Sequence, residues 1–348
     1  MSASEDLTAR HRASVFFTWT AQREAQPLQI VSGAGAHFQT ADGASWLDLG
    51  SMVWNAALGH GHAAMKRALV AAAERNLLAM LSLSGDPRRA PFDPGLPGGV
   101  AWNDPYSSEA GAGDLERVLA REDPKTVAAV LLEGVVGANG VYVPPAGYWK
   151  RVREVCDRHG VLLIADEVLS GFGRTGRWFA VDHDEVSPDI LTCAKGLTAG
   201  YAPGGATLVT PAIAGHFEDH VLSCGLTAYA HPLTCAAIVA AIEAYRGEEL
   251  IGRAERLGGV LEVQLRALAE RRPCVREVRG LGLLWALELD ARTTQMKQLA
   301  QELRTRHLHL HKRDTTLFVA PPLVIDEADL QAGVAALGEA LDAVWAQA

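Results

Sequence analysis

Two short apolar segments, each followed directly by an ionisable residue, most constrain how this chain can fold. Val161 to Ala165 precedes Asp166, and Ile190 to Ala194 precedes Lys195. Short apolar runs of this kind are typical of strands buried on both faces of a parallel sheet. Their separation suits two strands joined by a crossover. Because ligands bind outside the carboxyl ends of such strands, we expect the two side chains to lie at one site.

An acid and a lysine at neighbouring strand ends have a chemical use together. A lysine is most often a solvated charge, but small and apolar residues flank Lys195, and partial desolvation would lower its pKa toward the nucleophilic free amine. A carboxylate held against a pyridine nitrogen and a lysine able to form a Schiff base are what pyridoxal 5′-phosphate (PLP) chemistry requires. The pair formed by Asp166 and Lys195 therefore predicts a PLP site.

The composition is that of a globular chain large enough for two domains. Of 348 residues, 49% are hydrophobic and 21% charged. The net charge of −9 argues against nucleic acid or an anionic membrane as a standing partner. No apolar run approaches a membrane span, and the first twenty residues lack the apolar core of a secretion signal. The five cysteines fit no metal spacing and predict reduced thiols in a cytoplasmic protein.

Periodicity along the chain predicts an α/β fold with a mainly parallel central sheet and a smaller α+β domain. Asp42 and Gly43 mark a hairpin turn. The predicted strands lie at 127–132, 161–165, 190–194, 206–209 and within the segments VREVRGLGLLWALEL and LFVAPPLVI. The predicted helices lie at 114–120, 148–159, 249–271, 296–306 and 327–345, with others after GHGH and before Tyr245. We expect residues 1–75 and 246–348 to form the small domain and residues 76–245 the large one.

Two sequence patterns match nucleotide-binding motifs but lack the neighbouring residues or the secondary structure that those motifs need. Asp166 and Glu167 after an apolar strand match the second motif of P-loop proteins, but no Gly-Lys-Ser/Thr occurs in the chain. Gly171 to Gly176, GFGRTG, matches GxGxxG, but it does not open a helix directly after the strand. A loop that approaches a ligand or another backbone closely is the better account of these glycines.

The chain closely resembles the class III (omega) PLP-dependent aminotransferases, in the manner of the pyruvate-using omega-amino-acid and amine transaminases. The likeness is carried by LLIADEVLSGFGRTGRWFAVDH, SPDILTCAKGLTAGYAPGGA and GLTAYAHPL, and it extends to LDLGSMVWNAALGHGH and VRGLGLLWALEL. It covers nearly the whole chain in order. The resemblance implies the PLP-dependent transferase fold of type I, with a seven-stranded type of large domain.

The resemblance implies five cofactor contacts. Lys195 matches the Schiff-base lysine, which also moves a proton between the substrate Cα and the cofactor C4′. Asp166 matches the acid that keeps the pyridine nitrogen protonated, and Val168 matches a residue that packs on the ring. Thr227 matches a hydroxyl that reaches the phosphate bound to the neighbouring subunit. Glu133 matches an acid beside the substrate and the cofactor oxygen, although Gly134 replaces the usual proline after it.

Two further positions match the substrate pocket of the family. Trp54, five residues before Gly59, matches an aromatic residue of the substrate pocket. The alternative is that Trp54 only packs in the hydrophobic core. Arg313, eight residues before Pro321, lies where related transaminases place an arginine that binds a substrate carboxylate. A solvated charge is the alternative for Arg313.

The chain departs from the family in length. After the helix that ends near Met80, relatives have a further strand, a Gly-Ser/Ala-Glu-Ala helix start and a Tyr-His-Gly turn, whereas this sequence continues directly with LSLSGDPRR. In the family, the helix start anchors the phosphate and the turn supplies an aromatic that stacks on the ring. Either the protein lacks these elements, or the sequence omits segments of a longer chain.

The resemblance implies ping-pong transamination between an amine or omega-amino acid and an α-keto acid such as pyruvate, in a cytoplasmic homodimer. The shortened pocket leaves open a second reading, a non-catalytic relative that acts as a binding or scaffold protein. Retention of Asp166, Lys195, Thr227 and Arg313 favours the enzyme.

Overall fold

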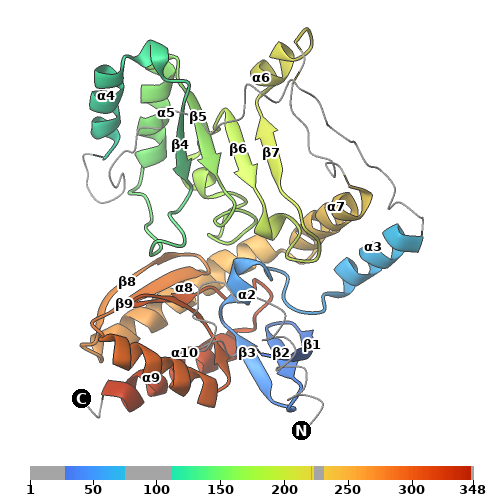
Figure 1. Ribbon diagram of the computed structural model, residues 1–348, viewed down its shortest axis with the longest axis vertical. Helices are drawn as coiled ribbons and strands as arrows, with labels where there is room; N and C mark the ends of the chain where they lie inside the picture. The colour runs from blue at the N-terminus through green and yellow to red at the C-terminus, as the bar shows by residue number, and fades with distance from the viewer. Residues whose placement is uncertain (1–27, 75–110, 221, 223–230, 346–348) are drawn as a thin grey trace, which may run out of the picture.

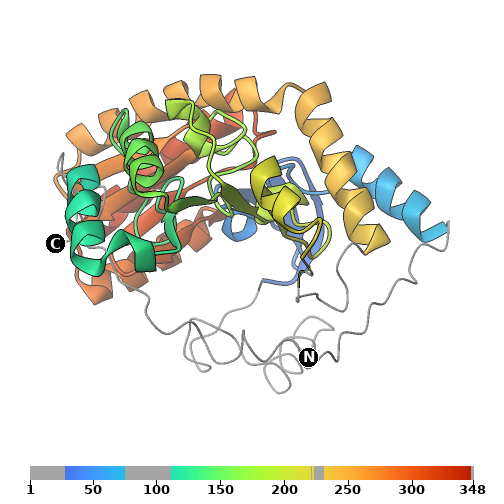
Figure 2. The same ribbon diagram turned by 90° about the horizontal axis from the view of Figure 1, so that it is seen from above.

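A computed structural model describes residues 28–74, 111–220, 222 and 231–345 of the chain. Within them the strands form three four-stranded sheets, in the orders β1-β2-β3-β10, β11-β12-β9-β8 and β4-β5-β6-β7. In Figure 1 the third sheet occupies the upper half and the other two lie below it. The upper strands β4, β5 and β6 run downward, so their carboxyl ends face the lower half. Figure 2 shows the same arrangement from above.

The upper sheet is the predicted parallel sheet. Its strands are β4 (Ala129–Glu133), β5 (Leu162–Asp166), β6 (Ile190–Cys193) and the antiparallel edge strand β7 (Ala206–Val209). The helices α4 (Gly111–Glu122) and α5 (Tyr148–His159) cover one face, where Trp149, Val152 and Leu163 are buried. The expectation that β5 is buried on both faces is wrong for the described residues. Leu131 and Leu162 are exposed, because the described helices supply a layer for one face only.

The first lower sheet joins the two ends of the chain. The strands β1 (Ile30–Ala34), β2 (His37–Thr40) and β3 (Ser45–Asp48) are consecutive and antiparallel, and the predicted turn at Asp42 and Gly43 connects β2 to β3. The two-residue strand β10 (Leu308–His309) pairs in parallel with β3. Helix α2 (Ser51–Trp54) and helix α3 (Ala63–Glu74) follow β3.

The second lower sheet belongs to the C-terminal third. The strands β8 (Val275–Leu281) and β9 (Leu284–Leu289) lie within the predicted strand segment VREVRGLGLLWALEL and form an antiparallel pair, which β12 (Thr316–Val319) and β11 (His311–Arg313) extend. The predicted strand LFVAPPLVI ends at Val319, because Pro321 and Pro322 have no N–H for a ladder. Helix α8 (Leu250–Glu270) packs on β8, and α10 (Glu327–Trp345) packs on α8 and on α9 (Thr293–Thr305).

The remaining elements are short, apart from one helix. Helix α7 (Pro232–Gly247) packs along α3, and helix α6 (Pro211–His216) follows β7. The 3-10 turns are η3 (Pro124–Thr126), η4 (Ala180–Asp184) and η5 (Lys195–Leu197). A search of the described helices finds none with the length and apolarity that a membrane crossing needs.

Candidate active site

Register within the parallel sheet places two carboxylates side by side. Glu133 ends β4 opposite Asp166, which ends β5, and Asp166 lies opposite Thr192 of β6. The amide of Gly134 donates to the carbonyl of Asp166 at 3.0 Å, so the pairing continues one residue past the strand ends. Lys195 follows β6 by two residues. Three adjacent parallel strands therefore deliver two acids and one amine to one edge.

Lys195 has a strained backbone conformation and a partly buried side chain. Lys195 has a backbone φ of 37°, in the left-handed region that residues other than glycine rarely adopt. The Tyr245 hydroxyl donates to the carbonyl of Gly196 at 2.6 Å and fixes the turn. Burial lowers the pKa of Lys195 below its usual value of 10.5, while the carboxylates of Asp166 and then Glu133 oppose that shift. The amine makes no hydrogen bond or ion pair with any residue that the structure describes.

The neighbouring carboxylates are held by backbone amides. Asp166 Oδ1 accepts from the amide of Val168 at 2.9 Å, and Glu133 Oε2 accepts from the amide of Gly137 at 2.9 Å. Val168 is half-buried next to Asp166. The sequence departure at Gly134 has a local cause, because a Cβ there would lie 2.7 Å from Glu167 Oε1 and from Ser170 Oγ. Glu167 and its partners fill the space that a proline ring would need.

Trp54 is the aromatic residue at this site. The Lys195 amine lies 5.3 Å from the centroid of the Trp54 ring, which is 5% exposed. His311 and Phe318 pack edge-on against the same ring, at centroid distances of 5.1 and 5.5 Å. The indole N–H is buried and has no acceptor among the described residues. A buried donor without a partner is costly, and it fits a site whose acceptor belongs to a bound molecule.

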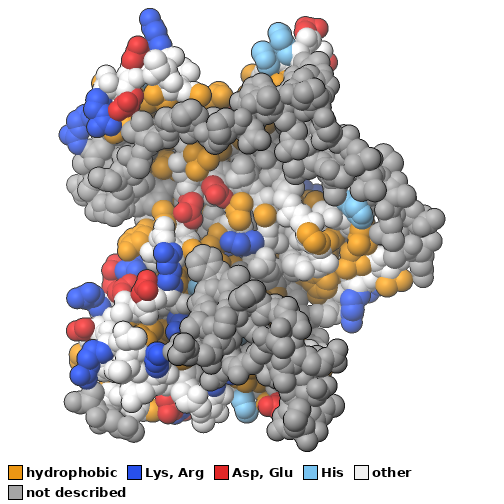
Figure 3. All heavy atoms as spheres, in the orientation of Figure 1, with side chains coloured by type: hydrophobic (Ala, Val, Ile, Leu, Met, Phe, Trp, Pro, Cys, Tyr) orange, Lys and Arg blue, Asp and Glu red, His pale blue; other side chains and the backbone are white. Residues whose placement is uncertain are grey.

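Arg313 lies apart from the other predicted site residues that the structure describes. Its guanidinium donates to Ala138 O at 3.1 Å and to Asn139 Oδ1 at 2.6 Å, and its side chain is 54% exposed. These partners lie in the loop that follows Glu133, so Arg313 borders the site without a contact to Lys195 or Asp166. Thr227 lies outside the described residues. In Figure 3, acidic and basic side chains meet at mid-height, between the two halves of the molecule.

Sequence patterns missed several residues that build this site. His311 packs on Trp54, and burial lowers its pKa below the ordinary 6.5. Ser51 begins the turn that carries Trp54, and Asp48 and Arg174 contact that turn. Arg174 lies in the predicted close-approach loop GFGRTG, but its partners are more than one hundred residues away in sequence, and no local spacing announces them.

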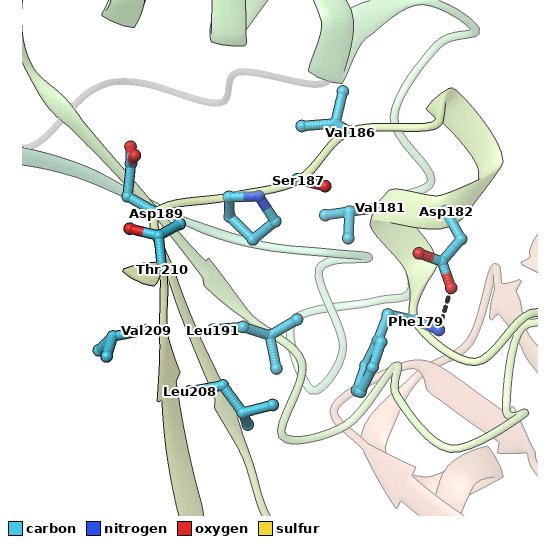
Figure 4. A pocket seen from close by; sticks show the side chains of 11 residues that line it. Phe179, Val181, Asp182, Val186, Ser187, Asp189, Leu191, Leu208, Val209 and Thr210 are labelled. Carbon is cyan, nitrogen blue, oxygen red and sulfur yellow. Dashed lines mark hydrogen bonds between the residues drawn. The ribbon is translucent and has the colours of Figure 1, made fainter. Parts of the chain in front are cut away.

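A pocket lies at the other end of β6, away from Lys195. It has a cavity volume of about 230 Å³ and is lined by the beginning of β6 and the end of β7, together with η4 (Figure 4). Its acids are engaged elsewhere, since Asp189 binds Arg153 and Asp182 accepts from the amide of Phe179. None of the predicted site residues lines it. We therefore place the candidate site at Lys195.

Comparison with known families identifies the chain. The sequence profile described as "Aminotransferase class-III" matches residues 90–341. The chain belongs to the class III aminotransferase family. Members of this enzyme family use PLP, and the family has the type I PLP-dependent transferase fold. The family resemblance and the fold class expected from the sequence are thus confirmed.

The relatives are aminotransferases with different substrates. An omega-aminotransferase of Caulobacter vibrioides is 38% identical over 247 residues, which are 68% of this chain and 56% of that protein. An acetylornithine aminotransferase of Methanopyrus kandleri is 40% identical over 73% of this chain and 62% of its own length. The chain thus spans little more than half of the curated relatives it matches.

A solved omega-transaminase structure matches nearly the whole chain. The crystal structure of an (S)-enantioselective omega-transaminase from Thermomicrobium roseum superposes with a TM-score of 0.89 over 98% of each chain, at 27% identity. A taurine:2-oxoglutarate aminotransferase from Bifidobacterium kashiwanohense, solved with PLP and glutamate, gives a TM-score of 0.85 at 28% identity.

The described residues fit the ring and aldehyde ends of PLP. Lys195 offers an amine that forms no other hydrogen bond within the described part, and Asp166 Oδ2 accepts none there. The strained lysine, the adjacent acids and the buried indole N–H together form a donor and acceptor set suited to this cofactor. The phosphate contact expected from Thr227 lies outside the described residues.

Proposed function

We propose that this protein catalyses PLP-dependent transamination between an amine or omega-amino acid and an α-keto acid such as pyruvate. The reaction is ping-pong: the donor leaves as a carbonyl compound before the keto acid enters. The observation that carries the proposal is that Lys195, Asp166 and Glu133 follow or end three adjacent parallel strands at one edge of the sheet, in a chain of the class III aminotransferase family.

The bound cofactor would supply an electron sink for a carbanion at the substrate Cα. Lys195 would hold the cofactor aldehyde and then act as the base that moves the proton between Cα and C4′. Its lowered pKa favours that role, because a larger share of the amine is free to accept a proton near neutral pH. Asp166 would keep the pyridine nitrogen protonated, and Val168 would pack on the ring. Glu133 would lie beside the cofactor oxygen, and Thr227 would reach the phosphate of the neighbouring subunit.

Substrate recognition is assigned to Trp54 and Arg313. The buried face of Trp54 excludes water from the amine-bearing end of the substrate, and its indole N–H is available to an acceptor on the ligand. Arg313 is bound to the loop at Ala138 and Asn139. To bind a substrate carboxylate it would have to exchange those two partners for the carboxylate oxygens.

The assembly and domain division are part of the same proposal. Parallel pairing of β10 with β3 supports one small domain made of residues 1–75 and 246–348, beside a large domain of residues 76–245. We propose a homodimer, because in the family the residue at Thr227 serves the cofactor of the partner. A cytoplasmic location is proposed from the reduced cysteines.

Isotope transfer tests the proposal. The full chain is incubated with PLP, a ¹⁵N-labelled primary amine and pyruvate, and ¹⁵N-alanine is measured by mass spectrometry. We expect labelled alanine from the parent and from Lys150→Ala, which changes an exposed lysine paired with Glu185, and none above background from Lys195→Ala. Equal transfer by the Lys195→Ala variant would contradict the assignment.

The binding or scaffold alternative rests on the shortened cofactor pocket, in which the sequence continues directly with LSLSGDPRR where the family has its phosphate anchor. It predicts that PLP attaches to no lysine of the parent. Borohydride reduction followed by peptide mapping separates the two readings.

A further inference from the structure

The residue that packs against Lys195 is carried by an unusual backbone turn. In α2, Ser51, Met52 and Trp54 have φ of 46°, 46° and 64°. L-amino acids avoid this left-handed conformation because Cβ crowds the following carbonyl, and single residues visit it more readily than a whole turn. A left-handed turn of ordinary residues persists only where its surroundings hold it.

One support is the buried carboxylate of Asp48. Its Oδ1 accepts from the amide of Gly50 at 3.1 Å, and its Oδ2 accepts from the amide of Met52 at 3.0 Å. Asp48 is itself fixed between two histidine rings, with His60 Nε2 at 2.9 Å and His309 Nδ1 at 3.0 Å. The first half of the turn is therefore bound to a rigid acceptor.

The other support is Arg174, a residue of the GFGRTG loop. It is 2% exposed and makes no ion pair with a carboxylate that the structure describes. Its guanidinium donates to Leu283 O at 3.0 Å, to Pro321 O at 2.5 Å and to Ser51 Oγ at 3.3 Å. The Ser51 hydroxyl in turn donates to Ala320 O at 2.5 Å. A buried charge is costly, and the rigid fork of Arg174 here joins the GFGRTG loop, the left-handed turn, the residue before β9 and the segment after β12.

We propose that Arg174, acting through the Ser51 hydroxyl, and Asp48 are positioning residues that hold the left-handed turn and so set Trp54 against Lys195. The expected kinetic consequence rests on the proposed transamination, whereas the structural link does not. Trp54 in turn limits where the amine-bearing carbon of a substrate can lie relative to the lysine. Displacing a positioning group by about 1 Å is enough to slow a reaction markedly.

Fluorine NMR of the full chain labelled with 5-fluorotryptophan tests the link directly. The chain has eight tryptophans, and Trp54→Phe identifies the resonance of Trp54 by its loss. We expect Ser51→Ala and Arg174→Lys to move the Trp54 resonance. Arg253→Lys is the matched control, because Arg253 donates to Ile325 O and Asp326 without touching the turn. We expect it to leave the Trp54 resonance in place.

Kinetics supply the second measurement. Ser51→Ala and Trp54→Phe are each expected to lower kcat/KM for the amine by about tenfold, and the double variant to be no slower than Trp54→Phe alone. An unmoved Trp54 resonance in Ser51→Ala, or losses that simply multiply in the double variant, would overturn the inference. Should the parent not react with PLP, the proposed function fails, but the NMR result still decides whether Ser51 and Arg174 set Trp54. Ser51→Ala removes one hydroxyl only, so the test survives if the Arg174 variant does not fold.

Discussion

At the scale of single residues, Lys195 combines a strained backbone with a partly buried amine. Lys195 has a left-handed backbone, which costs roughly 1 to 3 kcal/mol for a residue other than glycine. The same residue has a pKa lowered by burial. Tyr245 and the adjacent strand hold the backbone in place, so the strain is borne by the packing around the lysine. Neither feature helps the fold, and the lowered pKa raises the share of free amine, which is the nucleophilic form.

Asp48 should make the free energy of unfolding depend on pH in the acidic range. Burial raises the pKa of Asp48, but hydrogen bonds from His309 and then His60 outweigh it and lower the pKa from 3.8 to about 2. Because the folded-state pKa is the lower one, its stabilisation is complete above about pH 4 and is lost as the pH falls toward about 2. We expect a contribution of about 2 kcal/mol to the free energy of unfolding.

Urea unfolding at a series of pH values measures this contribution. Asp48→Asn should be less stable above about pH 4 and should lose less stability than the parent below it. Asp314→Asn is the control, since that side chain is 90% exposed and solvated whether or not the chain is folded. Parallel pH profiles for the parent and Asp48→Asn would show that the Asp48 carboxylate is not stabilised in the fold.

The local sequence pattern was enough to predict the residues that carry the proposed chemistry. It did not predict the residues that hold them in position. Lys195 and Asp166 each follow an apolar run, and parallel strands bring such ends together. Arg174 binds Pro321 across a sequence separation of 147 residues, and Asp48 binds His309 across 261. No periodicity encodes contacts of that range. Trp54 was predicted as a pocket residue, but the left-handed turn that carries it was not.

At the scale of elements, close backbone approach fixes how α8 packs. A Cβ added at Gly258 would lie 2.5 Å from the Cα of Gly282, in the turn between β8 and β9. A Cβ added at the next residue, Gly259, meets nothing within 4 Å. The two adjacent glycines of α8 therefore serve as a test position and its control.

We expect Gly258→Ala to lower the free energy of unfolding by about 1 to 3 kcal/mol, because backbone atoms cannot move aside as a side chain can. Gly259→Ala should leave stability unchanged or raise it by up to about 1 kcal/mol, since alanine is the better helix former. Urea unfolding of the two variants measures both values. Equal stabilities would mean that α8 does not approach the turn this closely.

Several elements follow the sequence closely. The helices predicted at 148–159 and 327–345 and the strand at 206–209 have the predicted bounds. The glycine loop also meets its expectation, since a Cβ at Gly173 would lie 2.6 Å from Ile251 Cδ1 and one at Gly176 would lie 3.0 Å from Glu255 Cα. The strand predicted through LFVAPPLVI was too long because apolarity alone does not register the two prolines.

At the scale of the whole molecule, the candidate site forms where the two halves meet. The large sheet contributes Glu133, Asp166 and Lys195 from its strand ends, and the lower half contributes Trp54, His311 and Phe318. The α/β fold class follows from the order of apolar segments. The family resemblance implies a seven-stranded type of large domain, and the sheet in the described residues has four strands.

The central claim is that Lys195 is the residue that takes the cofactor. Its most direct test is borohydride reduction of the full chain with PLP, followed by peptide mapping for a pyridoxyl group. We predict modification of Lys195 in the parent and in Lys150→Ala, and weaker modification of Lys195 in Asp166→Asn, which loses the ring-nitrogen partner. A parent chain with Lys195 unmodified, or with the pyridoxyl group mainly on other lysines, would contradict the account.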